Sequence, residues 1–230
     1  MSSPIAKAQK STADRALIAA HKKLSHNHRI SILANQFARR IKQLGKSGTP
    51  IELLDIGCGD MTLADEVGSR MTSCHIQCAD IHPCLPEVLE RDPRWHRYTV
   101  FDGRNLPYKD GQFDVAILSD VLHHVPPDMR LDLLRDARRV AKRVIIKDHF
   151  EYGWPSRQML RAMDFVGNFG YGVSVPERYF DRSSFESLCK QADMKIESMD
   201  VGLQLYAHLP IVRNLLSPNW HFFAVCCSVD

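Results

Sequence analysis

The stretch Glu52-Leu53-Leu54-Asp55-Ile56-Gly57-Cys58-Gly59-Asp60 is a mainly apolar run that contains Asp55 and leads into a glycine turn. The segment that follows has the composition of a helix. A strand, a glycine turn and a helix in this order are typical of a nucleotide site, because glycines let a ligand approach the backbone. The stretch therefore predicts an α/β domain with a ligand at the turn, and Asp55 narrows the choice of that ligand.

Two phosphate-binding patterns do not match this turn. A phosphate cradle requires a lysine to neutralise phosphate oxygens, and the segment from Gly57 to Thr62 contains no lysine. A dinucleotide fold requires a third glycine where Thr62 stands, and the carboxylates of Asp55 and Asp60 would repel an anion. The site suits a cation better, and S-adenosylmethionine (SAM) carries both an ammonium and a sulfonium.

Two further acids follow the next two predicted strands. Asp80 comes after an apolar strand, about twenty residues beyond the turn, where a carboxylate is placed to bind ribose hydroxyls. Asp102 follows a strand-like run and could accept a hydrogen bond from an adenine amine. Because ligands of open α/β sheets bind outside the carboxyl ends of the strands, these acids and Asp55 are expected to share one crevice.

Downstream motifs extend this pattern in the same order. Leu106-Pro107-Tyr108 leads to Gly111-Gln112-Phe113-Asp114-Val115 and then to Ser119-Asp120-Val121-Leu122-His123-His124-Val125. Together with Asp55-x-Gly57-x-Gly59, Asp80 and Asp102, these runs resemble the class I SAM-dependent methyltransferases, and most closely the group that includes the ubiquinone and menaquinone methyltransferases. The match covers roughly residues 51–148. Met61 is a departure, because many members have glycine there, and its bulk would reshape the methionine end of the pocket.

The resemblance implies a fold and a set of cofactor contacts. The expected fold is α/β, a Rossmann-like seven-stranded sheet with helices on both faces and an antiparallel last strand. Singly, the site residues could only make turns or cap helices, but their order favours a cofactor site. The residues expected to contact SAM are Asp55, Gly57, Cys58, Gly59, Asp80, Ile81, Asp102, Gly103, Ser119 and Asp120.

Periodicity and turn residues predict the order of elements. Strands are expected near 51–56, 74–79, 97–101, 113–119, 142–147, 195–203 and 219–228, and helices near 62–70, 84–90, 128–140 and 182–192. An amphipathic helix with Ile30, Leu33 and Phe37 on one face should precede the first strand. Its arginines should be solvated, or else contact an acidic lipid or cover the cofactor. We expect one domain over 1–230, with 1–46 as an N-terminal helical cap. An insertion over 150–180 should form a lid that excludes water, or else a helix that only packs on the sheet.

The resemblance also implies a methyl-transfer reaction, for which some acceptors need a residue that takes up a proton. Methyl transfer from a sulfonium releases a neutral thioether, so the protein mainly has to align donor with acceptor. A hydroxyl or protonated amine acceptor also needs a general base, and the candidates are His124 and His149, with His123 nearby. Alternatively, Lys147 forms an ion pair and His149 only caps a turn. The residues expected to contact the substrate are Asp148, Asp164, Asn168 and Tyr171.

Composition favours a small-molecule substrate. The chain has 230 residues, 44% of them hydrophobic, and a net charge of +3 without a basic stripe, so no nucleic acid is expected. The sequence Ser119-Asp120-Val121-Leu122 also lacks the [DNS]-P-P-[YF] pattern of enzymes that methylate nucleic-acid amines. Aromatic and methionine residues in the insertion suit a lipid-like or aromatic acceptor. Without a signal peptide or an apolar run of bilayer length, a cytoplasmic protein is expected.

Cysteines and histidines give no recognised metal pattern. The seven cysteines are expected to be reduced, and mostly in the core. Cys74, Cys78 and Cys84 with His75 and His82 do not have zinc-site spacing, so we expect no metal.

Two other functions are compatible with the same residues. A SAM-binding module without catalysis could serve as a regulatory or partner subunit. A nicotinamide oxidoreductase is possible only if Thr62 replaces the third glycine without harm. The acceptor atom and the oligomeric state stay open.

Overall fold

The computed structural model describes residues 27–45, 49–82, 94–167, 174–206 and 216–229. Seven strands form one sheet in the order β3-β2-β1-β4-β5-β7-β6. Their bounds are β1 Ile51–Ile56, β2 Cys74–Asp80, β3 Tyr98–Val100, β4 Phe113–Ser119, β5 Ala141–His149, β6 Met194–Val201 and β7 His221–Ser228. In this sheet β7 runs opposite to the other six strands, antiparallel to both of its neighbours, β5 and β6. The expected Rossmann-like fold with an antiparallel last strand is confirmed.

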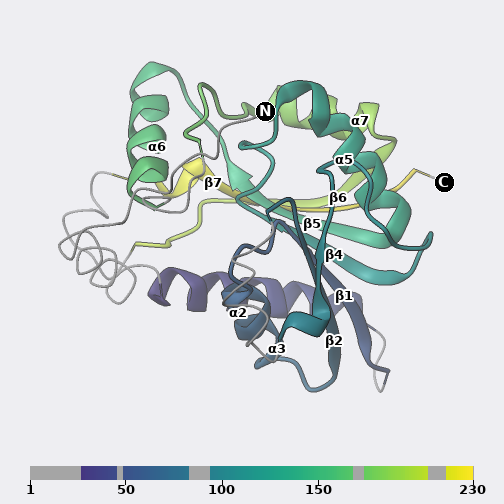
Figure 1. Cartoon of the computed structure of the whole chain (residues 1–230). Helices are drawn as coiled ribbons and strands as arrows, with labels where there is room; N and C mark the ends of the chain where they lie inside the picture. The colour runs from purple at the N-terminus through teal and green to yellow at the C-terminus, as the bar shows by residue number, and fades with distance from the viewer. Residues whose placement is uncertain (1–26, 46–48, 83–93, 168–173, 207–215, 230) are drawn as a thin grey trace, which may run out of the picture.

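Helices cover both faces of the sheet (Figure 1). The bounds are α2 Asn27–Leu44, α3 Thr62–Gly68, α5 Pro127–Val140, α6 Trp154–Gly167 and α7 Arg182–Gln191, with 3₁₀ turns η2 Trp95–Arg97 and η3 Pro218–Trp220. Figure 1 shows α2 and α3 on one face and α5 and α7 on the other. Each pair shares a hydrophobic core with the sheet face that it covers. The helix α6 stands apart, beyond the end of the strands (Figure 1).

The central strands are apolar along nearly their whole length because both of their faces are covered. In β1, Leu53 and Leu54 point to opposite faces and both are fully buried. In β4, Ala116 and Ile117 show the same pattern. From β1 the sheet grows in one direction through β2 and β3 and in the other direction through β4 and β5. The carboxyl ends of β1 and β4 therefore form the switch point where ligands bind in such sheets.

The helix α2 buries the predicted face but not by hydrophobic residues alone. Ile30, Leu33 and Phe37 are buried, as their spacing predicts. The expectation that the arginines are solvated is wrong for Arg40, which is only 6% exposed, because it pairs with Asp200 and lies 4.3 Å above the ring centre of Phe223. A guanidinium can stack on an aromatic ring while it keeps its ionic partner, and the helical wheel does not show this.

Element boundaries agree closely with the periodicity. The predicted strands at 51–56 and 113–119 match β1 and β4, and β5 extends further at both ends than the predicted 142–147. The helix predicted near 84–90 lies outside the described residues, as do Cys84, Asn168 and Tyr171. Among the residues that the structure describes, no helix combines the length and hydropathy that a bilayer span needs.

Candidate active site

The glycine turn connects β1 to α3 and lies against β2. Gly57 has φ of 75°, and a Cβ atom there would lie 2.5 Å from Val121 Cγ2, so a side chain at this position would strain the backbone and displace Val121. Its backbone N–H donates to Ala79 at 2.7 Å, which holds the turn beside β2. Met61 also has positive φ, 62°, and its side chain is fully buried. A left-handed residue with a side chain costs roughly 1–2 kcal/mol, and burial of the methionine offsets that cost.

Two carboxylates meet at this turn. Asp55 is 1% exposed, and its Oδ2 atom has no hydrogen-bond partner among the described residues. Burial, with the neighbouring charge of Asp80, raises the pKa of Asp55 to about 7. Asp80 accepts hydrogen bonds from the backbone of Gly59 at 2.9 Å and of His82 at 3.1 Å. An unpaired buried carboxylate beside a second one favours a cation, which fits the ammonium of SAM.

The adenine end expected from the sequence contains an apolar platform. Ile81 is 53% exposed, and its Cγ2 atom lies 3.2 Å from where a Cβ atom of Gly103 would be. Asp102 accepts hydrogen bonds from the backbone of Arg104 at 2.8 Å and from the backbone and side chain of Asn105, and these bonds lower its pKa to about 2. Asp102 therefore also holds its own turn, which is the structural alternative to adenine binding.

Cys58 lies in the turn and faces the strand next to β1. Its side chain is buried, and a hydrogen bond with Cys78 together with burial raises the pKa of the Cys58 thiol. Both cysteines are free thiols. Cys58 is thus not a thiolate ligand, and its backbone N–H donates to the carbonyl oxygen of Ala79 at 3.3 Å.

Asp120 follows β4 but is held by two cations. Its two carboxylate oxygens face Lys147 of β5 and Arg29 of α2 as ion pairs. Burial opposes the charge of Asp120, but the two cations outweigh it and hold the pKa of this carboxyl well below its usual range. Asp120 therefore ties α2 to the sheet, while Ser119, directly before it, is half-buried at the strand end.

His123 lies between two carboxylates at the same edge. Its Nδ1 atom is 2.6 Å from Asp148 Oδ1, and its Nε2 atom is 3.4 Å from Asp164 Oδ2. The Tyr179 hydroxyl also donates to Asp164. Burial disfavours a charged ring, but both carboxylates favour it, and the net effect raises the pKa of His123 to about 10. The raised pKa favours the protonated ring, which has no lone pair to accept a proton.

His124 has the opposite protonation. Its Nδ1 atom lies 3.0 Å from the carbonyl oxygen of Ser174, which can only accept, so Nδ1 carries the proton and Nε2 the lone pair. Burial and the charge of His123, whose ring centroid is 4.0 Å away, lower the pKa of His124. A neutral imidazole with a defined tautomer has the properties of a general base.

His149 is buried deeper than His124. Its backbone N–H donates to Asp148 at 2.7 Å, and its Nδ1 atom lies 3.4 Å from Asp120 without hydrogen-bond geometry. Burial and Lys147 lower the pKa of His149, so this ring is also neutral. Its side chain is only 4% exposed, which limits direct access for an acceptor.

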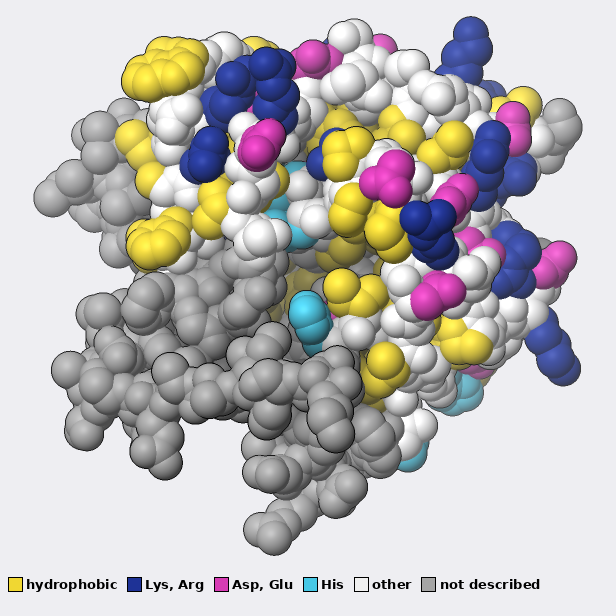
Figure 2. Space-filling model, turned by 45° about the horizontal axis from the view of Figure 1, so that its top comes forward, with side chains coloured by type: hydrophobic (Ala, Val, Ile, Leu, Met, Phe, Trp, Pro, Cys, Tyr) yellow, Lys and Arg dark blue, Asp and Glu magenta, His cyan; other side chains and the backbone are white. Residues whose placement is uncertain are grey.

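Sequence reasoning missed His221, which pairs with His149 in the register of β5 and β7. The ring centroids of these two histidines are 4.7 Å apart, and that of His123 is 5.1 Å from His149. His124, His123, His149 and His221 thus form a continuous series of rings, here called the histidine row. Figure 2 shows histidine side chains near the centre of one face, next to hydrophobic ones. The antiparallel last strand was the signal that places His221 at this edge.

Two groups of side chains in this region have potential metal-ligand atoms within 4.8 Å of one another. One group is His123, Asp148 and His149, and the other is His123, His124 and Asp164. His123 belongs to both, and a protonated ring held between two carboxylates accounts for the close spacing. The expectation of no metal stays a prediction.

The candidate substrate residues come together only in part. Asp148 and Asp164 both approach His123, from β5 and from α6 respectively. Asp164 interrupts an apolar stretch of α6, and its carboxylate has two partners, His123 and Tyr179. Asn168 and Tyr171 lie outside the described residues.

Comparison with known proteins gives a family. A family model described as a methyltransferase domain matches residues 27–199. No curated protein sequence matches the chain. Among solved structures, the mitomycin 7-O-methyltransferase MmcR is 16% identical, with a TM-score of 0.60, over 94% of this chain and 56% of that one. This chain thus spans little more than half the length of MmcR.

A second structure has a length similar to that of the present chain. It is a SAM-dependent methyltransferase from Methanosarcina mazei, 19% identical with a TM-score of 0.60, over 83% of this chain and 97% of that one. At such identities the structures show a shared fold, whereas the family model covers most of the sequence. The chain belongs to the methyltransferase domain family.

Proposed function

We propose that this chain transfers the methyl group of SAM to a small-molecule acceptor that is lipid-like or aromatic. The observation that carries the proposal is the buried carboxylate of Asp55, which has an oxygen without a partner among the described residues and lies beside Asp80 at the glycine turn. The motif likeness to the ubiquinone and menaquinone methyltransferases supports an acceptor of that kind.

In the proposed complex, each part of SAM meets a group of matching chemistry. Asp55 would hold the ammonium, whose positive charge would stabilise the carboxylate charge that burial otherwise disfavours. The ribose hydroxyls donate to the carboxylate of Asp80, which keeps lone pairs beyond its bonds to Gly59 and His82. The adenine packs on the exposed side chain of Ile81. Bound SAM supplies an electrophilic methyl group, and its loss leaves a neutral thioether.

His124 is the proposed general base for a hydroxyl acceptor. The acceptor hydroxyl gives its proton to His124 Nε2 as the new oxygen–methyl bond forms and the sulfur–methyl bond breaks. The products are the methyl ether, S-adenosylhomocysteine and a protonated His124, which later returns its proton to water. Burial, and then the positive charge favoured on His123, lower the pKa of His124, and Asp148 and Asp164 hold His123 in place. His149, with less access, is the second candidate.

Titration calorimetry with SAM tests this proposal. The wild-type protein should bind SAM, and Asp55→Asn should bind about tenfold or more weakly, because a charge-assisted hydrogen bond contributes about 1.5–3 kcal/mol. Asp114→Asn is the matched control, since Asp114 pairs with Lys142 on the surface. No binding by the wild type at millimolar SAM would refute the proposal. Equal affinity of the wild type and Asp55→Asn would refute the placement of SAM.

A further inference from the structure

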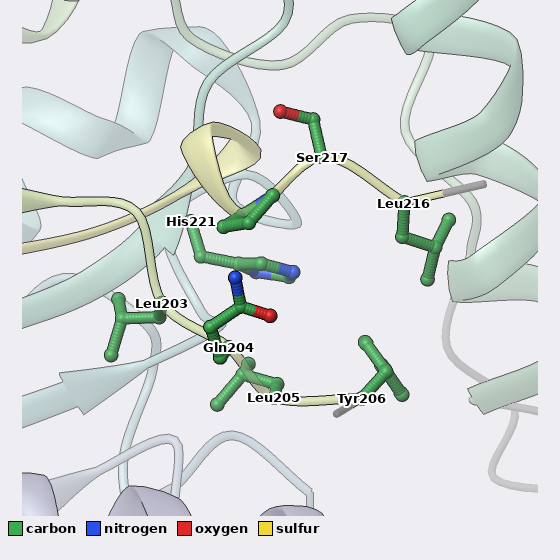
Figure 3. A pocket seen from close by; sticks show the side chains of 8 residues that line it. Leu203, Gln204, Leu205, Tyr206, Leu216, Ser217 and His221 are labelled. Carbon is green, nitrogen blue, oxygen red and sulfur yellow. The ribbon is translucent and has the colours of Figure 1, made fainter. Parts of the chain in front are cut away.

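The two ends of the histidine row differ in what surrounds them. At one end the ring of His221 is buried, and Figure 3 shows it among the side chains of segments 203–206 and 216–218. At the other end His124 is partly exposed and lies in the turn 120–126, between β4 and α5. Turns move more readily than the strands and helices that they connect. The position of the proposed base therefore depends on the contacts that fix this turn.

Arg130 of α5 donates hydrogen bonds to two carbonyl oxygens of the turn. Its Nε atom lies 2.8 Å from the carbonyl oxygen of Val125, and its Nη2 atom lies 3.3 Å from that of His123. These two carbonyl groups belong to the residues directly before and directly after His124. One guanidinium group thus holds the backbone on both sides of the proposed base.

The guanidinium group of Arg130 is itself held from two sides. Its backbone belongs to α5, which packs on the sheet through buried residues such as Leu133 and Leu134. Its central carbon lies over the ring of Phe180, 4.8 Å from the ring centroid, and Phe180 is buried. A guanidinium can contact an aromatic ring with its face while its N–H groups donate in the plane, and the ammonium of lysine cannot. The contact therefore requires an arginine.

The position of this turn also sets the position of the His124 ring. The Nδ1 atom of the ring lies 3.0 Å from the carbonyl oxygen of Ser174, a contact that fixes the tautomer. A general base must reach the proton that it accepts within about 3 Å. A displacement of about 1 Å can lower a rate about 10²-fold.

We infer that Arg130 is a positioning residue for methyl transfer, which holds the turn so that His124 keeps its bond to Ser174 and its reach to the acceptor. The inference rests on the proposed function for the role of His124 as the base. The contact of Arg130 with the turn is testable without an acceptor, because the tautomer of His124 reports it.

Long-range ¹H–¹⁵N spectra of the histidine rings provide this test. In the wild type, the ring of His124 should carry its proton on Nδ1, because the carbonyl oxygen of Ser174 only accepts. Arg130→Met removes the donors and keeps an unbranched side chain. Without the donors the ring should leave Ser174, and the signals should shift toward the form with the proton on Nε2. The signals of His124 are identified by their loss in His124→Gln.

Turnover provides a second measurement, with an acceptor found by a screen for methyl uptake. Arg130→Met should lower kcat about 10- to 100-fold, because it displaces the base. The affinity for SAM should stay unchanged, because Asp55 and Asp80 keep their positions. Arg130→Lys keeps the charge but cannot bridge two carbonyl oxygens over an aromatic ring, so it should also lower kcat.

A second variant and a control complete the experiment. Phe180→Leu removes the ring below the guanidinium and keeps an apolar side chain in the core. It should shift the same His124 signals and lower kcat about two- to fivefold, the factor of a partly exposed cation–π contact. This variant keeps the test decisive if Arg130→Met does not fold. Arg135→Met is the control, because Arg135 lies in the same helix and donates to the carbonyl oxygen of Gln191 at 3.1 Å, at the end of α7. The control should match the wild type in both measurements.

Two outcomes would overturn the inference. One is a His124 ring signal that is the same in the wild type, Arg130→Met and Phe180→Leu, and the other is full turnover in Arg130→Met. SAM calorimetry on the same samples separates the inference from the proposed function. SAM binding with an unchanged ring signal rejects only the inference, whereas a shifted ring signal in a protein that does not bind SAM rejects the proposed function.

Discussion

The two ends of β5 carry the same kind of ion pair in opposite environments. Near its start, Lys142 pairs with Asp114 at 2.7 Å, and the lysine side chain is 63% exposed. Near its end, Lys147 pairs with Asp120, and the lysine side chain is fully buried. Another exposed pair, His75 with Glu52, lies at the starts of β2 and β1, and we call these amino-terminal ends of the strands the exposed edge of the sheet. At the other edge, formed by the carboxyl ends of the strands, the charged side chains are buried together with the histidine row.

The difference between the exposed and the buried ion pairs indicates a function for the buried charges. Exposed pairs contribute about 0–1 kcal/mol, and their geometry is easily replaced. Buried pairs lose solvation that their attraction often does not exceed, so stability alone is a weak reason to keep them. Charges that are concentrated at the edge where ligands bind fit a role in binding and proton transfer. Three experiments examine this contrast, in order of expected effect.

The largest effect is expected for the proposed base. His124→Gln should lower methyl-transfer turnover about 10²- to 10⁴-fold, because general-base catalysis contributes that range. The measurement is the turnover of an acceptor found by a metabolite screen for methyl uptake. His75→Gln, at the exposed edge, should leave turnover unchanged. Since burial and the charge of His123 lower the pKa of His124, wild-type turnover at saturating SAM should fall when the pH drops below the ordinary range of histidine. Unchanged turnover in His124→Gln would exclude this histidine as the base.

The second effect concerns stability, and it compares two lysines of one strand. Lys147→Met should lower the free energy of unfolding by about 3–5 kcal/mol, because it leaves Asp120 buried with one cation fewer. Lys142→Met should lower it by less than about 1 kcal/mol. Urea denaturation of both variants provides the values. If the two losses are equal, the contrast between the edges has no energetic basis.

The third effect is a pH dependence of SAM affinity. Because burial first, and then Asp80, raise the pKa of Asp55 to about 7, the carboxyl is increasingly protonated in the unliganded protein below that pH. It must lose this proton to face the ammonium, so affinity should fall by up to about tenfold per pH unit between pH 7 and 5. Calorimetry in buffers of different ionisation enthalpy should detect proton release. The pH dependence should be absent from Asp55→Asn, and its persistence there would assign the titration to another group.

Local patterns were enough to predict the sheet and the turn. The glycine turn depends on backbone geometry over a few residues, so the positions of Gly57 and Asp55 at the end of the first strand could be predicted, while their contacts with SAM stay a prediction. Contacts set by strand order could not be predicted in this way. Arg29 reaches Asp120 across much of the chain, and His221 meets His149 only because β7 pairs with β5. Asp102 shows the remaining ambiguity, since the same carboxylate that could bind adenine also closes its own turn.

Because Arg29 of α2 pairs with Asp120, the packing of α2 on the sheet depends on the charge of this carboxylate. Arg29 belongs to a helix that precedes the whole sheet, yet its guanidinium is one of two cations that keep Asp120 ionised. Removing the helix from the sheet would therefore raise the proton affinity of that carboxyl. By reciprocity, protonating Asp120 loosens the helix by the same free energy.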